Sequence, residues 1–119
     1  AAGASKVIPL AVAGAFHTSL MEPAAQSLRE ALASVRIADF SVPVYSNVDA
    51  SPRATGEGVA ELLSRQLVSP VRWEDSIRRM IDDGVEGFVE VGTGRVLRGT
   101  IKRVARKTPL EGFGDGNEA

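Results

Sequence analysis

The chain has 119 residues, of which 44% are hydrophobic and 24% are charged, and its formal net charge is -1 at pH 7. This balance is typical of one globular domain or a piece of one, and it excludes a strongly basic nucleic-acid-binding protein. The absence of cysteine excludes disulfides, thiolate metal sites and cysteine nucleophiles, and it fits a cytoplasmic protein. No apolar run approaches the ~20 residues of a membrane helix, so we expect no membrane partner.

The first predicted elements are a strand and a helix joined through the single histidine of the chain. The apolar run VIPLAV at residues 7–12 favours a short strand. His17 follows, and apolar residues at helical spacing then predict an amphipathic helix over about residues 20–35. Ser19 and Glu22 stand at the spacing of a capping box, which marks the start of this helix.

The middle of the chain is predicted to hold one strand and two helices. Residues 42–46 (VPVYS) favour a strand, and residues 49–57 are a polar segment with turn chemistry, expected to be a loop. Apolar spacing predicts one helix over 59–67 and another that begins near Trp73. Gly84 is placed to close the second helix as a C-cap glycine.

The last third repeats the order of strand, turn and helix. Residues 87–91 (GFVEV) predict a strand, Gly92-Thr93-Gly94 a turn, and residues 96–104 a basic helix. The Gly-rich, acidic segment 109–119 is expected to be a flexible tail. Alternation of strands and helices indicates the α/β class with a largely parallel sheet. About three strands are few against the ~5–6 of a mean sheet, so we expect further strands from sequence outside this chain.

His17 has two interpretations that the residues alone leave open. It is either a surface or capping histidine, or a general base at a strand-to-helix junction, where open α/β sheets place their sites. A base requires a nucleophile, and no G-x-S-x-G elbow is present; Ser19 and Ser46 stand in cap and strand-end contexts. One histidine without cysteine also makes a metal site improbable, so none is predicted.

Two further features of the last third allow a structural and a functional interpretation. VGTGRVLRG, residues 91–99, suggests an anion cradle, yet it matches neither G-x-G-x-x-G nor a Walker loop, and a tight strand-to-helix turn is the favoured interpretation. The helix after it carries several cations, which are either a solvated face or a surface for an acidic partner.

Four sequence blocks occur in a fixed order: GAFHTSLMEPAA, PVYSNVDA, RQLVSPVRWEDSI and VEVGTGRVLRGTIKR. Together they resemble the C-terminal part of the malonyl-CoA:acyl-carrier-protein transacylases over roughly residues 1–108. The resemblance implies part of a hydrolase-like three-layer α/β/α domain, incomplete on its own. Residues 1–12 would be the last strand of a small inserted ferredoxin-like subdomain, 13–108 the C-terminal part of the acyltransferase domain, and 109–119 the tail.

The resemblance also implies a reaction and roles for particular residues. In that family a serine takes malonyl from malonyl-CoA as an ester and passes it to the phosphopantetheine thiol of acyl carrier protein for fatty acid biosynthesis, without a further cofactor. His17 matches the histidine that activates the serine, and the backbone carbonyl of Gln66 matches the group that orients the imidazole. Phe16 matches a position linked to preference for malonyl over methylmalonyl. Lys102 and Arg103, on the basic helix, are the candidates for docking acyl carrier protein.

The family's nucleophilic serine, its malonyl-binding arginine and its glutamine-rich oxyanion block are absent from this sequence. We therefore expect a fragment that is inactive alone and needs the missing N-terminal part of the enzyme as a partner. An acyltransferase domain of a polyketide synthase, a non-catalytic acyl-carrier-protein docking module, and a small independent α/β protein remain alternatives. The absence of a further domain after Thr108 favours a discrete enzyme.

Overall fold

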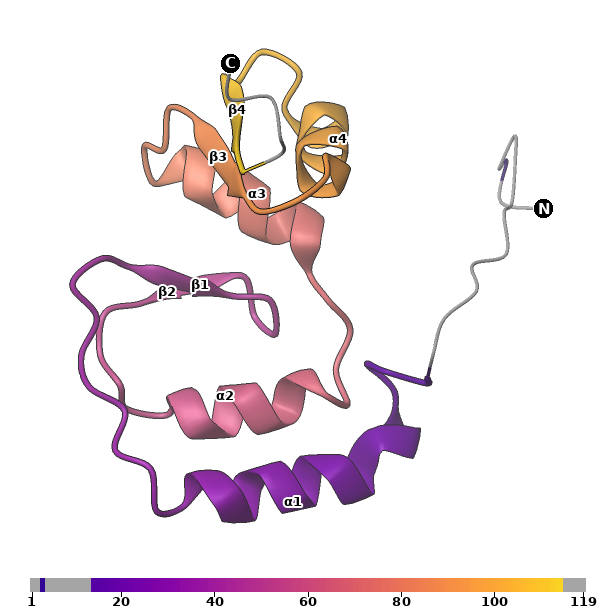
Figure 1. Ribbon diagram of the computed structural model, residues 1–119, viewed down its shortest axis with the longest axis vertical. Coiled ribbons are helices and arrows are strands. Elements are labelled where there is room, and N and C mark those ends of the chain that lie inside the picture. The colour runs from indigo at the N-terminus through magenta and orange to yellow at the C-terminus, as the bar shows by residue number, and fades with distance from the viewer. Residues whose placement is uncertain (1–2, 4–13, 115–119) are drawn as a thin grey trace.

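The computed structural model describes Gly3 and residues 14–114, so the strand expected at residues 7–12 lies outside the described residues. Helices and strands are interspersed along the chain (Figure 1). In order they are a 3-10 helix η1 (Ser19–Met21), α1 (Glu22–Leu32), β1 (Val44–Ser46), β2 (Ser51–Arg53), α2 (Val59–Gln66), α3 (Trp73–Asp82), β3 (Phe88–Val91), α4 (Val96–Val104) and β4 (Leu110–Phe113).

Helices α1 and α2 lie side by side in one part of the molecule (Figure 1). Ala25 on α1 and Ser64 on α2 are both fully buried, and such small side chains allow two helices to approach closely. The Ser64 hydroxyl donates to the carbonyl of Ala60 at 2.9 Å, which satisfies its polar group inside the interface. The predicted helix begins two residues later than expected, because Thr18 caps the 3-10 turn that precedes it.

Strands β1 and β2 form an antiparallel hairpin above α2 (Figure 1). Its turn is held by Asp49, whose side chain accepts from the N–H of Ser51 at 3.3 Å, and by Ala50, which adopts a left-handed backbone. Residues 51–53 were expected to lie in a loop, and this prediction is wrong. Pro52 made the strand hard to recognise in the sequence, because proline lacks the backbone N–H that a strand donates. Within sheets it is tolerated at edges such as this one.

The remaining elements form a second group, in which β3 and β4 pair in parallel and α4 connects them. Ile77 on α3 and Ile101 on α4 are buried where these two helices meet. The expectation of a flexible tail is wrong for residues 110–113, since they form β4 with Leu110 opposite Phe88. Leu110 and Gly112 face inward and alternate with exposed residues, which is the two-residue period of a strand. The glycines of the segment made this period hard to recognise in the sequence.

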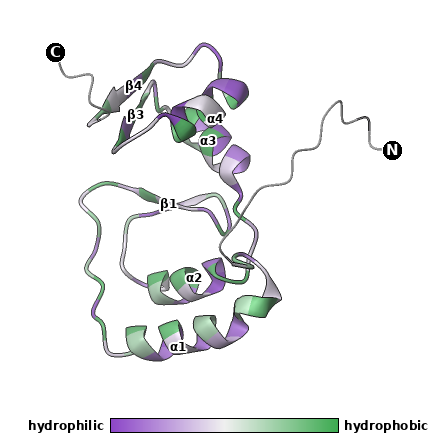
Figure 2. Cartoon of the chain, turned by 45° about the vertical axis from the view of Figure 1, so that its right-hand side comes forward, coloured by the Kyte–Doolittle hydropathy of each residue, from purple (hydrophilic) through white to green (hydrophobic). Residues whose placement is uncertain are grey.

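The α/β class is confirmed, with a small parallel sheet that is only part of a domain. The residues that the structure describes form two separate two-stranded sheets, and one of them is antiparallel. Their buried hydrophobic side chains number five: Ala25, Val48, Ala50, Ile77 and Ile101. Apolar residues remain exposed on helices and strands, among them Val91 and Val96. Figure 2 shows that the helices carry both hydrophobic and hydrophilic residues.

Candidate functional site

The backbone of His17 is held in an uncommon conformation at the start of the α1 segment. Its φ is 64°, in the left-handed region that non-glycine residues rarely occupy. The His17 N–H donates to the carbonyl of Leu67 at 2.9 Å, so the segment before α1 is fastened to the end of α2. Left-handed backbone at a side chain that projects from the surface is a form of strain found at functional sites.

The imidazole of His17 contacts the same end of α2. Its Nδ1 lies 2.8 Å from the carbonyl oxygen of Gln66. Because a carbonyl can only accept, this contact requires a proton on Nδ1, and in the neutral ring Nε2 then keeps its lone pair. The carbonyl is available because α2 ends at Gln66 and the last carbonyls of a helix have no partner within the helix. The expected pairing of His17 with the Gln66 carbonyl is therefore present, 49 positions apart in sequence.

Phe16 stands directly before the histidine and is 54% exposed. Its ring lies against Gly14, where an added Cβ would come within 3.1 Å of the ring. The absence of a side chain at Gly14 allows this close approach of the ring. Phe16 is thus an exposed apolar side chain next to His17 in sequence, and its contact with a substrate stays a prediction.

A largely apolar cavity of about 220 Å³ opens between the hairpin and α2 and ends at Gln66. Tyr45, Ser46 and Asn47 form its hairpin side and Leu62 and Leu63 part of its helix side. The Ser46 hydroxyl accepts from the N–H of Val48 at 3.2 Å, which is a structural role within the turn. The cavity is therefore lined in part by the residue whose carbonyl contacts His17.

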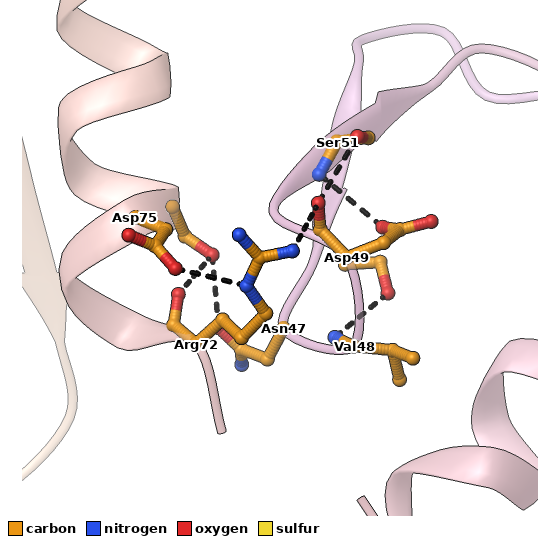
Figure 3. A network of polar contacts seen from close by, with 8 residues as sticks. Asn47, Val48, Asp49, Ser51, Arg72 and Asp75 are labelled. Atoms are coloured by element: carbon orange, nitrogen blue, oxygen red, sulfur yellow. Dashed lines mark hydrogen bonds and ion pairs between the residues drawn. The ribbon is translucent and has the colours of Figure 1, made fainter. Parts of the chain in front are cut away.

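A polar network ties the hairpin turn to the segment that follows α2 (Figure 3). The N–H of Arg72 donates to the carbonyl of Asn47 at 2.9 Å, and its side chain reaches both Asp75 and the carbonyl of Asp49. Ser76, which is buried, donates to the carbonyl of Arg72 and contacts the Asn47 side chain at 3.4 Å. The network thus fixes the hairpin turn against the start of α3.

The glycine turn after β3 does not form an anion cradle. Glu90 on β3 places its carboxylate at the start of α4, where it accepts from the backbone N–H groups of Leu97 at 2.9 Å and Arg98 at 3.1 Å. The bond from the Arg98 backbone is the main reason that the pKa of Glu90 lies below its ordinary value. The amides that would bind a phosphate are occupied by a side chain, so the favoured interpretation as a structural turn is confirmed.

Sequence reasoning missed Glu90, although a signal existed in its position. A carboxylate at the end of a strand, just before a glycine turn, can reach the unsatisfied amides of the next helix. The turn that allows this uses Gly92 and Gly94, whose φ values are 128° and 100°.

Lys102 and Arg103 lie on the exposed side of α4, as the helical spacing predicted. Together with Gly99 and Arg106 they line a shallow groove. The groove lies on α4, whereas His17 contacts the end of α2. Helices α4 and α2 belong to different groups of elements (Figure 1). The structure therefore does not bring the basic groove and the imidazole together.

Within residues 14–114, no cluster of three or more histidine, cysteine, aspartate or glutamate side chains is arranged to hold a metal ion. In the same part of the chain, no helix is both long and apolar enough to cross a membrane.

The fold and the site define a class: a partial α/β domain that presents a histidine whose ring is oriented by a helix-terminal carbonyl. No protein-family model matches the chain. It is 48% identical over 105 residues to the malonyl CoA-acyl carrier protein transacylase of Bacillus subtilis, covering 88% of this chain and 33% of that protein. It is 42% identical to the transacylase of the same name from Escherichia coli K12, covering 87% of this chain and 34% of the relative.

Solved structures agree with the sequence comparison. MCAT from Streptococcus pneumoniae superposes with a TM-score of 0.90 at 44% identity, over 96% of this chain and 37% of that one. A type II PKS acyl-carrier protein in complex with its malonyl-transacylase matches with a TM-score of 0.83 at 37% identity, over 93% of this chain and 35% of that one. The resemblance to malonyl CoA-acyl carrier protein transacylases is confirmed, and the chain corresponds to their C-terminal portion. It spans about a third of the length of these relatives.

Proposed function

We propose that this chain supplies the general base of a malonyl transfer site, and that the site is completed by a polypeptide equivalent to the rest of the relatives. The observation that carries the proposal is the bond between His17 Nδ1 and the Gln66 carbonyl. This bond leaves Nε2 as a base at a position accessible to solvent and substrate. The names of the relatives support malonyl-CoA and acyl carrier protein as the two substrates.

The proposed chemistry needs a serine from the completing polypeptide. His17 Nε2 takes the proton from the serine hydroxyl as its oxygen attacks the thioester carbon of malonyl-CoA. The imidazolium then returns that proton to the departing coenzyme A sulfur, which leaves a malonyl ester on the serine. In the second half, His17 takes the proton of the phosphopantetheine thiol as its sulfur attacks the ester, and returns it to the serine oxygen. The resemblance supports a role in cytoplasmic fatty acid biosynthesis.

Phe16 is proposed to shape the acyl pocket beside His17. An aromatic ring at this place leaves little space for an α-methyl group, which favours malonyl over methylmalonyl. A steric effect of one methyl group corresponds to about 1–3 kcal/mol, so the preference is expected to be partial.

The primary test uses intact-mass spectrometry of two polypeptides with malonyl-CoA. We expect no malonyl adduct on this chain alone, because the chain lacks the nucleophile. Mixed with a polypeptide equivalent to the first two thirds of the Bacillus subtilis relative, it should cause that partner to gain one malonyl group. The His17→Ala chain should lower the acylation rate by orders of magnitude, whereas Ser46→Ala should not.

Two results would contradict the proposal. Malonylation of this chain by itself would reveal a nucleophile within it and require a different mechanism. An adduct on the partner that forms equally fast with the His17→Ala chain would show that His17 is not the base. Binding of the two polypeptides is checked first by size-exclusion chromatography, so that both results refer to an assembled pair.

The basic groove on α4 favours a second function, the docking of acyl carrier protein. Lys102 and Arg103 are exposed and stand beside Arg106, a concentration of positive charge that suits an acidic partner. A related malonyl-transacylase has been captured with an acyl-carrier protein. Docking and base catalysis are compatible, since the groove and His17 are separate.

The docking role predicts a loss of carrier affinity on charge reversal. Lys102→Glu combined with Arg103→Glu should weaken carrier binding at least about tenfold at low salt, measured by titration calorimetry. Arg36→Glu, an exposed charge reversal outside the groove, is the matched control. Equal weakening by both variants would indicate a general charge effect and would contradict docking in the groove.

A further inference from the structure

The side chain of Gln66 makes contacts that the carbonyl contact does not require. Its amide nitrogen Nε2 donates to the carbonyl of Ser69 at 3.2 Å and lies 3.3 Å from His17 Nδ1. One residue thus approaches the same ring nitrogen with a backbone acceptor and a side-chain donor.

The orientation of this amide follows from its partner. The Ser69 carbonyl is an acceptor, so the nitrogen of the amide must face it, since two oxygens at this distance would repel each other. The nitrogen is then also the atom beside His17 Nδ1. A donor at that place cannot accept the Nδ1 proton, so the proton has the Gln66 carbonyl as its acceptor.

The link between Gln66 and Ser69 also closes the turn at the end of α2. This turn carries both carbonyls that hold His17, Gln66 for the ring and Leu67 for the backbone. Two backbone bonds also hold this turn, from the Leu67 N–H to the Ser64 carbonyl at 3.4 Å and from the Val68 N–H to the Arg65 carbonyl at 3.1 Å, and the Gln66 amide adds a third bond at 3.2 Å. The amide therefore stiffens the segment on which the orientation of the imidazole depends.

We propose that the Gln66 side-chain amide is a positioning group for His17: anchored on the Ser69 carbonyl, it holds the turn so that the imidazole stays protonated at Nδ1 and bare at Nε2. The benefit for catalysis rests on the function proposed above, because it requires Nε2 as the base. The effect on the tautomer does not depend on that function, and it can be measured without any substrate.

The test is long-range ¹H–¹⁵N NMR of the histidine ring in the full chain, at a pH where the ring is neutral. The chain has one histidine, so the two ring nitrogens are assigned without ambiguity. We expect a protonated Nδ1 and a bare Nε2 in the wild type. In Gln66→Met, which keeps an unbranched side chain and removes the amide, the Nδ1-protonated fraction should fall and the two nitrogen shifts should move toward each other.

The control variant is Gln26→Met on α1, where the amide donates to Glu30 at 2.7 Å, away from the histidine. It should leave both ring nitrogens unchanged. An unchanged or larger Nδ1-protonated fraction in Gln66→Met would overturn the proposal, the larger fraction showing that the amide competes for Nδ1. If Gln66→Met fails to fold, the wild type decides: a nuclear Overhauser contact between the Gln66 amide protons and the ring supports the proposal, and its absence overturns it.

The malonyl-transfer assay separates this inference from the proposed function. Loss of the Nδ1-protonated tautomer in Gln66→Met, together with acylation that does not depend on His17, would retain the positioning role and remove the catalytic one. Acylation that requires His17 but is unaffected by Gln66→Met, with an unchanged tautomer, would retain the function and remove the positioning role.

Discussion

At the scale of single residues, the site is built from backbone groups more than from side chains. His17 is held by two successive carbonyls, one for its backbone and one for its ring. Because these carbonyls belong to the backbone, the side chains of the two residues can be replaced without removing them. Gln66 is an exception, since its side chain makes a contact of its own. Phe16 differs, because its contribution is the volume of its ring.

We predict that Phe16→Ser raises the use of methylmalonyl relative to malonyl in the assembled transfer assay. The reason is the space that opens beside His17, and the expected change in the ratio is about tenfold or more for a steric effect of one methyl group. Competition between the two acyl-CoA substrates, followed by mass spectrometry, measures the ratio. Leu20→Ser, which removes another exposed apolar side chain near the site, is the control. An unaltered ratio would contradict a role for Phe16 in selection.

At the scale of elements, small buried contacts and capping groups hold the helices in place. Ile77 on α3 is 1% exposed, in the group that also contains α4, β3 and β4. Glu90 fastens the start of α4 to β3, and Asp83 fastens the end of α3 to β1 by accepting from the Tyr45 hydroxyl at 2.8 Å. Each of these contacts joins two elements, so its loss would loosen one element from the other.

We predict that Ile77→Ala destabilises the chain by about 2–5 kcal/mol, because it removes buried methyl groups and leaves a cavity. Urea unfolding followed by the fluorescence of Trp73, the single tryptophan, measures the change. Val71→Ala, at a position that is 42% exposed, should change stability far less. Similar losses of stability for both variants would show that Ile77 on α3 does not belong to a packed core.

The carboxylates of Asp83 and Glu90 predict a pH dependence of stability. Arg79 chiefly holds the pKa of Asp83 below its ordinary value, and the Arg98 backbone chiefly does so for Glu90. A pKa that is lower in the folded chain adds stability above the unfolded values of ~4, and this stability is lost as pH falls through the folded values. The urea midpoint should therefore drop on acidification below about pH 4.

The variant Glu90→Gln isolates one of these carboxylates. It should lower the urea midpoint at neutral pH and have a smaller effect at a pH where the wild-type carboxyl is protonated. Glu86→Gln, at an exposed glutamate just before β3, is the matched control. If Glu90→Gln lowered the urea midpoint by the same amount at every pH, the negative charge of Glu90 would contribute nothing at the start of α4.

At the scale of the whole molecule, the described residues expose many large apolar side chains. Large hydrophobic side chains that are more than half exposed include Leu20, Val91 and Val96. Among the residues that the structure describes, strands β1 and β3 each have one paired neighbour, so one edge of each strand has no ladder within this part of the chain. Both features fit the proposal that further polypeptide completes the sheet.

We predict that a polypeptide equivalent to the first two thirds of a relative covers this surface. Binding of the dye ANS to this chain should be strong and should fall by more than half when the partner is added at equal concentration. Lysozyme at the same concentration is the control for nonspecific shielding. Dye binding that is weak for the chain alone would contradict an exposed apolar face.

Four helices and the pairing of His17 with Gln66 could be predicted from the sequence, for two different reasons. Apolar periodicity is a local property, so the helices at α1 to α4 were readable from spacing alone. The His17 and Gln66 pair lies 49 positions apart, and it was anticipated through family resemblance. Periodicity and spacing alone left His17 as either a capping residue or a base.

What the sequence by itself determined is the α/β class, the helices and the family resemblance, because local spacing and ordered motifs carry them. Only the tertiary structure revealed β2, β4, the role of Glu90 and the second contact of the Gln66 side chain. Short strands next to proline or glycine become strands only when a partner supplies hydrogen bonds. A carboxylate or an amide likewise acquires its role from the backbone groups that folding brings within reach.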